Sequence, residues 1–181
     1  MELIAQIIGI AAMGFNILSY QQKTRSRVIA FQLFGGFLFC INFFLLGAIS
    51  GSLLNAVAVI RAIVFLNKEK LRADRPLWLA GFVAVYLLCY GLTFTVFGTE
   101  ATTRNLILEA LPVIGMTATT ISFRLTDAKS IRRYGLISSP SWLIYNVANF
   151  AIGAIICEVL SLGSIILGII RLDLKKKDSS N

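Results

Sequence analysis

Seven apolar runs separated by short loops extend over almost the whole chain, and each run is close to the length that crosses a bilayer. Only 14% of the 181 residues are charged, against about a quarter in a typical soluble domain, and 57% are apolar. Because an unpaired backbone cannot face lipid, each run is expected to be a helix. The sequence predicts an all-α polytopic membrane protein, with transmembrane helices at approximately 3–20, 28–47, 51–67, 77–97, 105–124, 134–153 and 155–171.

Basic residues distinguish the two sets of connecting segments. The segments after the first, third, fifth and seventh runs are rich in Lys and Arg, whereas the opposite loops contain only Arg104. Because basic residues favour the cytoplasmic side, the N-terminus is expected outside and the C-terminus in the cytoplasm. Anionic lipid head groups are the expected partners of the basic segments. The basic residues are Lys23, Arg25, Arg27, Lys68, Lys70, Arg72, Arg75, Arg124, Lys129, Arg132, Arg133, Arg171, Lys175, Lys176 and Lys177.

Other classes of function find little support in the composition. The net charge of +8 does not indicate nucleic-acid binding, because no basic face with interleaved aromatic residues lies outside the apolar runs. The chain has no His, the commonest metal ligand and general base. Cys40, Cys89 and Cys157 lie apart, in or beside apolar runs, as small core residues do. No metal site, cofactor or catalytic residue is predicted, and the chain is not expected to be an enzyme.

A short repeat indicates an internal duplication. Gly47-Ala48-Ile49, between the second and third runs, recurs as Gly153-Ala154-Ile155 between the sixth and seventh. Two parallel three-helix units must each begin outside and end inside, so one helix has to return the chain between them. The run at 77–97 has no Asp, Glu, Lys or Arg and suits this connector role. The pattern predicts a 3+1+3 plan: a first repeat at 1–67, the connector and its loops at 68–104, a second repeat at 105–172, and a basic, polar tail at 173–181.

Three charged residues lie inside the apolar runs. A charge near the bilayer centre costs at least about 2.5–3.5 kcal/mol, so it should face the bundle interior or water. Arg61 is expected near mid-membrane, and Glu109 and Glu158 lie nearer the outer surface. We expect Arg61 to orient an anionic or polar group of a solute, and the two glutamates to bind a cation or carry a proton. Alternatively, Arg61 snorkels or forms a structural pair, and the glutamates lie at the interface near helix N-termini.

Amides and helix-weakening residues form a second set of candidates. Buried amides either bind a polar solute or join helices, at about 0.6 kcal/mol per interhelical bond. Gly9 and Pro112 occupy roughly equivalent places in the first and fifth runs, where they are candidate hinges. Close packing at the glycine and a static kink at the proline are the alternatives. The candidate solute-binding amides are Asn42, Asn55, Asn146 and Asn149.

Several short segments together carry a family likeness. They are Ser19-Tyr20-Gln21 before a basic loop, Phe43-Phe44-Leu45-Leu46-Gly47 running to Asn55 and Arg61, Leu111-Pro112-Val113-Ile114-Gly115, Trp142-Leu143-Ile144-Tyr145-Asn146, and Gly153 through Glu158 to Arg171. In their order and spacing, the chain resembles the YgjV family of bacterial inner-membrane proteins over essentially its whole length. The resemblance implies a multi-pass protein of the bacterial inner membrane.

The YgjV family is in turn distantly similar to the SWEET and PQ-loop transporters. The proline–glutamine pair of PQ-loop proteins is absent here, since Gln21 follows Tyr20. Of the prolines that sugar carriers have in the first helix of each half, only Pro112 is present. The resemblance therefore implies a transporter-like architecture and does not imply sugar as the substrate.

Two hypotheses for function follow from these features. The first is a small-molecule transporter that works by alternating access between the two bundles, with a small polar or anionic solute as substrate. The second is a non-transporting scaffold or lipid-binding protein, whose basic cytoplasmic loops contact anionic lipids or a partner. A water-filled cavity reaching Arg61 would distinguish the first from the second. Both hypotheses are compatible with an oligomer.

Overall fold

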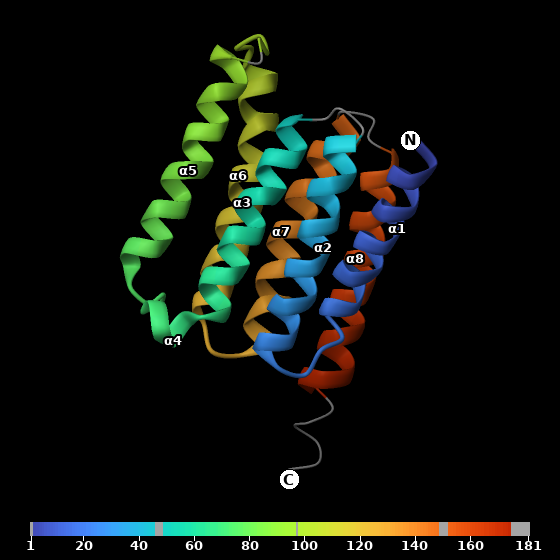
Figure 1. Cartoon of the computed structure of the whole chain (residues 1–181), viewed down its shortest axis with the longest axis vertical. Helices are drawn as coiled ribbons and strands as arrows, with labels where there is room; N and C mark the ends of the chain where they lie inside the picture. Colours follow the sequence, from blue (N-terminus) through green and yellow to red (C-terminus); the bar gives the residue numbers. More distant parts are fainter. Residues whose placement is uncertain (1, 46–48, 97, 149–151, 175–181) are drawn as a thin grey trace.

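All regular elements of the chain are helices. The computed structural model describes residues 2–45, 49–96, 98–148 and 152–174, and no strand occurs among them. Long helices lie side by side with their axes roughly parallel (Figure 1), so the all-α prediction is confirmed. The described elements are α1 (Glu2–Ser19), α2 (Arg25–Leu45), α3 (Ile49–Leu66), α4 (Lys68–Leu71), α5 (Pro76–Thr95), α6 (Thr103–Arg124), α7 (Ala128–Ala148), α8 (Ile152–Gly168) and the π-helix η1 (Ile169–Leu174), which extends α8.

Several helices match the thickness of a bilayer. Within the described residues, three segments are long and apolar enough to cross a membrane: Pro76–Thr95, Thr103–Arg124 and Gly153–Leu174. Leu3–Ser19 and Ser52–Leu66 are apolar but shorter. At 1.5 Å per residue, the 18-residue α1 and α3 are about 27 Å long, slightly less than a hydrocarbon core of about 30 Å.

Polarity is distributed with the apolar side chains outside and many polar ones inside. Leu3 and Leu77 are 73% and 77% exposed, and most of the long helices present further large apolar side chains on their outer faces. By contrast, Arg61 and Arg132 are buried, together with several serines and amides. Water-soluble proteins rarely expose so much contiguous apolar surface. The distribution fits a lipid-facing exterior around a polar interior.

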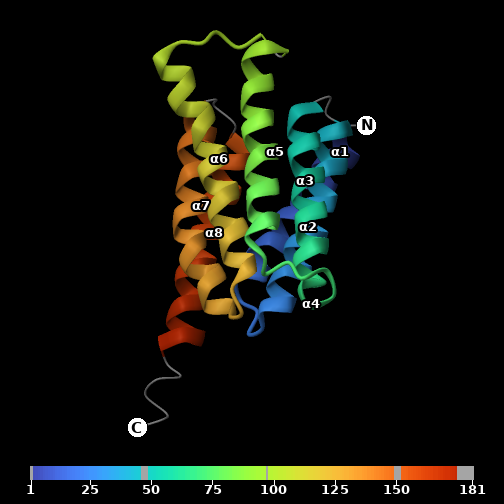
Figure 2. The same cartoon turned by 90° about the vertical axis from the view of Figure 1, so that its left-hand side faces the viewer.

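The helices pack in two groups that follow the chain order. α1 packs on α2 and α2 on α3, while α6 packs on α7 and α7 on α8. The two groups meet where α1 contacts α8, α2 contacts α7 and α3 contacts α6. α5 contacts α6 and lies at the edge of the bundle, in front of α3 and α6 in Figure 2. Any cavity shared by the two groups must therefore lie between α1–α3 and α6–α8.

An aromatic cluster joins helices from both groups near the basic loops. Phe65 of α3 is fully buried, and its ring centroid lies 6.0 Å from that of Phe82 on α5 and 6.1 Å from that of Phe123 on α6. Val28 and Ile29 of α2 belong to the same buried cluster. Tilted and edge-to-face rings at these separations attract one another beyond the burial of their area. The cluster thus anchors α2, α3, α5 and α6 to one another.

One long helix begins well before its predicted start, and one short helix was not predicted. α7 begins at Ala128 instead of 134, whereas the other long helices begin within about three residues of their predicted starts. The predicted start of α7 followed the apolar run and is wrong, because a capped helix extends past its apolar part. Asp127 caps α7 by accepting a hydrogen bond from the backbone N–H of Ser130. The segment Lys68–Leu71, predicted as loop, forms α4.

The contact of α8 with the end of α1 leaves no room for a side chain at Gly168. A Cβ atom there would lie 2.6 Å from the carbonyl oxygen of Tyr20 and 2.8 Å from Cδ of Arg132. We expect Gly168→Ala to destabilise the protein by about 1–3 kcal/mol through overpacking. Gly163→Ala, in the same helix with nothing within 4 Å of the added Cβ, is the control. Thermal unfolding in detergent measures the difference, and equal melting temperatures for the two variants would contradict this packing.

Candidate functional site

A cavity of about 660 Å³ lies between the two groups of helices. Its lining includes Gln6 of α1 and Gly153 of α8, which are exposed and lie near the helix ends opposite the basic loops. The cavity therefore opens toward those ends. Its polar lining residues are Gln6, Asn16, Tyr20, Gln32, Asn42, Asn55, Arg61, Thr119, Ser138, Ser139, Asn146, Glu158 and Ser161.

Arg61 of α3 lies in the cavity wall next to α5 and α6, and it is 7% exposed. Its Nη1 donates to the hydroxyl of Tyr86 and to the carbonyl oxygen of Met116, both at 3.2 Å. The guanidinium lies over the ring of Phe123, with Cζ 5.2 Å from the centroid. Its Nε is buried and has no hydrogen-bond partner among the described residues. Arg61 therefore does not snorkel to the surface, and part of its donor capacity is unused.

Glu158 of α8 lines the same cavity. Its carboxylate approaches Ser139 of α7, and so does the hydroxyl of Tyr20. Tyr20 lies within electrostatic range of both Glu158 and Arg61. Tyr20 lies at the end of an apolar run but is 8% exposed, so it belongs to the interior. Among the described residues, no group of three or more His, Cys, Asp or Glu could hold a metal ion.

The amides occupy the cavity wall, and one of them also joins helices. Asn42 of α2 is buried, and its Nδ2 donates to the carbonyl oxygen of Ala5 in α1 at 2.6 Å. A Cβ at Gly9 would lie 3.0 Å from that same Nδ2, so glycine here lets the amide approach α1. Asn55 and Asn146 line the cavity from α3 and α7. The Nδ2 amide group of Asn42 therefore already uses one of its N–H donors in a bond between helices.

Glu109 and Pro112 of α6 are not among the residues that line the large cavity. Both line a second pocket of about 70 Å³, bounded by α3, α5, α6 and α7, which adjoins the large cavity at Leu54, Met116 and Trp142. The hydroxyl of Tyr145 donates to Oε1 of Glu109 at 3.5 Å, and α6 continues through Pro112 without a break. Asn149 and the first two residues of Gly47-Ala48-Ile49 lie outside the described residues. Of the predicted site residues, the large cavity brings together Gly9, Asn42, Asn55, Arg61, Asn146 and Glu158.

Arg132 of α7 joins helices at the end of the bundle near the basic loops, beside Tyr20 of the cavity lining. It is 2% exposed and donates to the carbonyl oxygens of Tyr20 at 3.4 Å and Gln22 at 3.0 Å, just after α1. It also makes a bidentate ion pair with Asp173 of η1, in which Nε lies 3.0 Å from Oδ2. Arg132 was predicted as a loop residue that orients the chain. Arg132 instead lies buried within α7, so the predicted loop placement is wrong. Its side chain joins the end of α1 and η1 to α7.

Arg25, at the start of α2, joins helices at the same end of the bundle. Its Nη2 donates to the carbonyl oxygen of Phe65 at 2.9 Å, and its Nε donates to that of Phe123 at 3.0 Å. These carbonyls belong to the last turns of α3 and α6, where backbone acceptors lack partners within their own helix. A cation there also suits the negative end of the helix dipole. In the same region, the ammonium of Lys68 donates to the carbonyl oxygen of Arg124.

A helical bundle with apolar outer faces and an interior cavity lined in part by charged and amide side chains defines the chain as a membrane protein by class. Residues 3–176 match the family model Imp-YgjV, which is described as a bacterial inner membrane protein. The chain therefore belongs to the YgjV family of bacterial inner membrane proteins, and the family predicted from its motifs is confirmed. No curated protein matches the chain, and no solved structure matches it.

Replacing Asp173 would leave Arg132 as a buried cation with carbonyl partners only. Breaking a buried ion pair by removing one partner costs about 3–5 kcal/mol, so we expect Asp173→Asn to lower the melting temperature markedly. Glu69→Gln, which removes an exposed carboxylate at the same end of the molecule, should have almost no effect. If the two variants have the same melting temperature, the ion pair does not stabilise this end of the bundle.

Proposed function

We propose that this protein transports a small polar solute across the bacterial inner membrane by alternating access. The cavity of about 660 Å³ carries the proposal, because it gathers polar and charged side chains inside a bundle whose exterior is apolar. Polar groups at membrane depth are costly unless they face one another or a water-filled path. A solute path between the two helix groups accounts for the number and position of these polar side chains.

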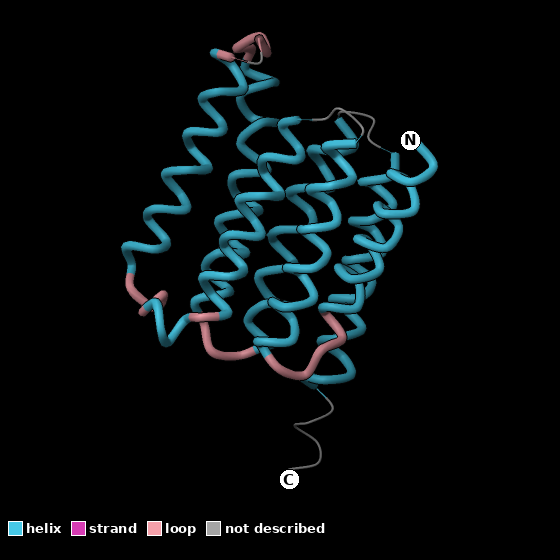
Figure 3. The backbone as a smooth tube through the Cα atoms, viewed as in Figure 1, coloured by secondary structure: helices cyan, strands magenta, loops and turns pink. Residues whose placement is uncertain are grey.

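The proposed architecture is 3+1+3, with seven transmembrane helices. α1–α3 and α6–α8 form the two bundles, and α5 is the connector. The described loops lie at the two ends of the helices in Figure 3, as loops outside a bilayer must. The shorter α1 and α3 fit a bilayer that thins locally around them.

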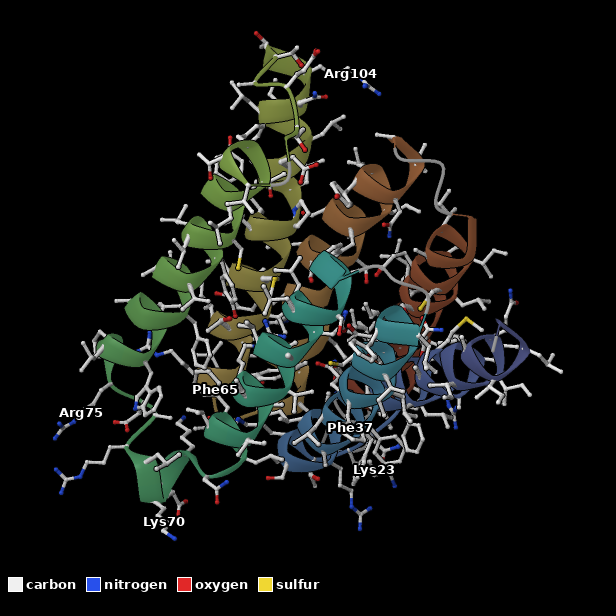
Figure 4. The ribbon with its side chains drawn as sticks, turned by 45° about the horizontal axis from the view of Figure 1, so that its top comes forward. Lys23, Phe37, Phe65, Lys70, Arg75 and Arg104 are labelled. Atoms are coloured by element: carbon white, nitrogen blue, oxygen red, sulfur yellow. The ribbon has the colours of Figure 1, made fainter. Side chains whose placement is uncertain are left out.

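The proposed orientation places the basic loops in the cytoplasm. Figure 4 shows Lys23, Lys70 and Arg75 toward one end of the molecule and Arg104 at the opposite end. The positive-inside rule puts the end with the greater number of basic residues on the cytoplasmic side. The cavity then opens to the periplasm.

Reporter fusions test this orientation. Green fluorescent protein fused after Asn181 should fluoresce, because the C-terminus is cytoplasmic in this topology. Alkaline phosphatase at the same place should be inactive, because its disulfides form only after export. The same phosphatase inserted at Thr99, in a loop on the other side, should be active and serves as the control. An active C-terminal phosphatase would reverse the orientation.

We assign the structure to the state that is open to the periplasm. The contacts of Arg25 and Arg132 close the cytoplasmic end, so these contacts must break before a solute can leave on that side. Rocking of one bundle against the other would break them while it closes the periplasmic end. Pro112 removes one backbone hydrogen bond from α6 and is the proposed bending point, with Gly9 its counterpart in α1.

Within the cavity, Arg61 is proposed to orient the solute. Asn55 and Asn146 supply neutral hydrogen bonds from the walls formed by α3 and α7. Glu158 is the proposed site for a cationic group, because it lines the same cavity. Glu109 is not given that role, since it lines the other pocket and contacts Tyr145.

Water access to position 55 tests the cavity. In a variant without the native Cys40, Cys89 and Cys157, Asn55→Cys should react with a membrane-impermeant maleimide added from the periplasmic side. Leu88→Cys is the control, because Leu88 is 61% exposed on an apolar face of α5, where lipid suppresses formation of the reactive thiolate. If Asn55→Cys is as inert as Leu88→Cys, the solute path is absent. The non-transporting scaffold or lipid-binding alternative would then be favoured.

A further inference from the structure

We propose that the cavity binds a small zwitterionic solute of the amino-acid class, with its carboxylate at Arg61 and its ammonium group at Glu158. The proposal rests on the transport function above and names the class of its substrate. It begins from the two charges of opposite sign in the cavity wall, one on α3 and one on α8.

Neither charge belongs to an ion pair among the residues that the structure describes. The ion pair among the described residues joins Arg132 to Asp173 at the cytoplasmic end, and neither Arg61 nor Glu158 takes part in one. The partners of Arg61 are a hydroxyl and a backbone carbonyl, both neutral, and its buried Nε has no partner among the described residues. The groups near Glu158 are the hydroxyls of Ser139 and Tyr20 and the thiol of Cys157, none of which is a cation. Each charge therefore lacks a counter-charge at membrane depth.

The unpaired charges discriminate between classes of solute. A buried charge without a counter-charge raises the free energy of the protein. A solute that supplies the counter-charges lowers this free energy when it binds. A monoanion would pair only Arg61, a monocation only Glu158, and a neutral polyol neither. An amino acid supplies a carboxylate, which a guanidinium can bind in bidentate fashion, and an ammonium group for the other side.

The remaining lining fits such a solute. Arg61, Glu158 and Tyr20 line the same cavity, so both charges face one space. Asn55 and Asn146 add neutral hydrogen-bonding groups, and Trp142 adds an apolar surface for a side chain. The volume of about 660 Å³ falls within the roughly 300–1,000 Å³ of small-ligand sites, so it holds an amino acid with water around it.

A matched set of probes tests the proposal on the purified full chain in detergent, by isothermal titration calorimetry. The zwitterions are L-leucine and 6-aminohexanoate, which differ in the separation of their charges. 3-Methylbutylamine and 4-methylpentanoate each lack one charged group of leucine, and glucose is the neutral probe. At least one zwitterion should bind about tenfold more tightly than each of the others, which is about 1.4 kcal/mol. Equal or tighter binding of a singly charged or neutral probe, or no binding of either zwitterion, overturns the proposal.

Exchange of one charge provides a readout that a purely structural role would not change. In Glu158→Gln, the preference for the more tightly bound zwitterion over 4-methylpentanoate should disappear, because the amide no longer attracts the ammonium group. In Arg61→Gln, the preference over 3-methylbutylamine should disappear. Arg61 also holds Tyr86 and Met116, so its replacement can unfold the protein; Glu158→Gln leaves those bonds in place and decides the test alone. Glu109→Gln, in the other pocket, is the matched control and should keep both preferences.

Failure of this proposal can be told from failure of the transport function. If Asn55→Cys is labelled from the periplasm and the zwitterions do not bind preferentially, the substrate class is wrong and the solute path stands. If Asn55→Cys is inert like Leu88→Cys, the path is absent and both proposals fall together.

Discussion

Lipid tails form no hydrogen bonds with polar side chains, and this constraint determines how the interior of the protein is arranged. Asn42 satisfies it by donating to a carbonyl of α1, and Arg61 satisfies it in part through a tyrosine hydroxyl and a carbonyl of α6. The interior nevertheless holds more hydrogen-bonding capacity than it uses, since Nε of Arg61 and Oγ of Ser161 are buried without partners among the described residues. Surplus capacity around an open space is what distinguishes a binding cavity from a set of interhelical bonds.

The end of the bundle near the basic loops obeys the same constraint with a different result. Arg25 and Arg132 direct their guanidinium groups to backbone carbonyls at or just beyond helix ends, where acceptors are free by the geometry of the helix. These two basic residues therefore join neighbouring helices. Hydrogen bonds from charged donors to fixed carbonyls are strong, so they hold that end of the bundle together, whereas the exposed residues Gln6 and Gly153 of the cavity lining lie toward the other end.

The sequence predicted the features that depend on local pattern. It missed the features that depend on which direction a side chain faces around its helix axis. Apolar runs located the long helices, and short motifs identified the family. Arg132 was placed in a loop because the segment 128–133 looks polar, yet a cap at Asp127 allows α7 to begin there, and the arginine is buried. Tyr20 likewise lies at the end of an apolar run, but its side chain is buried in the interior. The pairing of Asp173 with Arg132, 41 residues away, has no local signal at all.

Glu109 and Glu158 show how this limitation affects function. Counting residues placed both at a similar depth, yet one lines a small pocket beside Tyr145 and the other lines the large cavity with Arg61. The proposed solute path therefore contains one positive and one negative group instead of an excess of carboxylates. A charge that crosses the membrane potential gains or loses about 2.3 kcal/mol per 100 mV. With balanced charges in the wall and a zwitterion between them, the loaded and empty cavities carry the same net charge. Rocking of the bundles would then proceed with little electrical penalty in either direction.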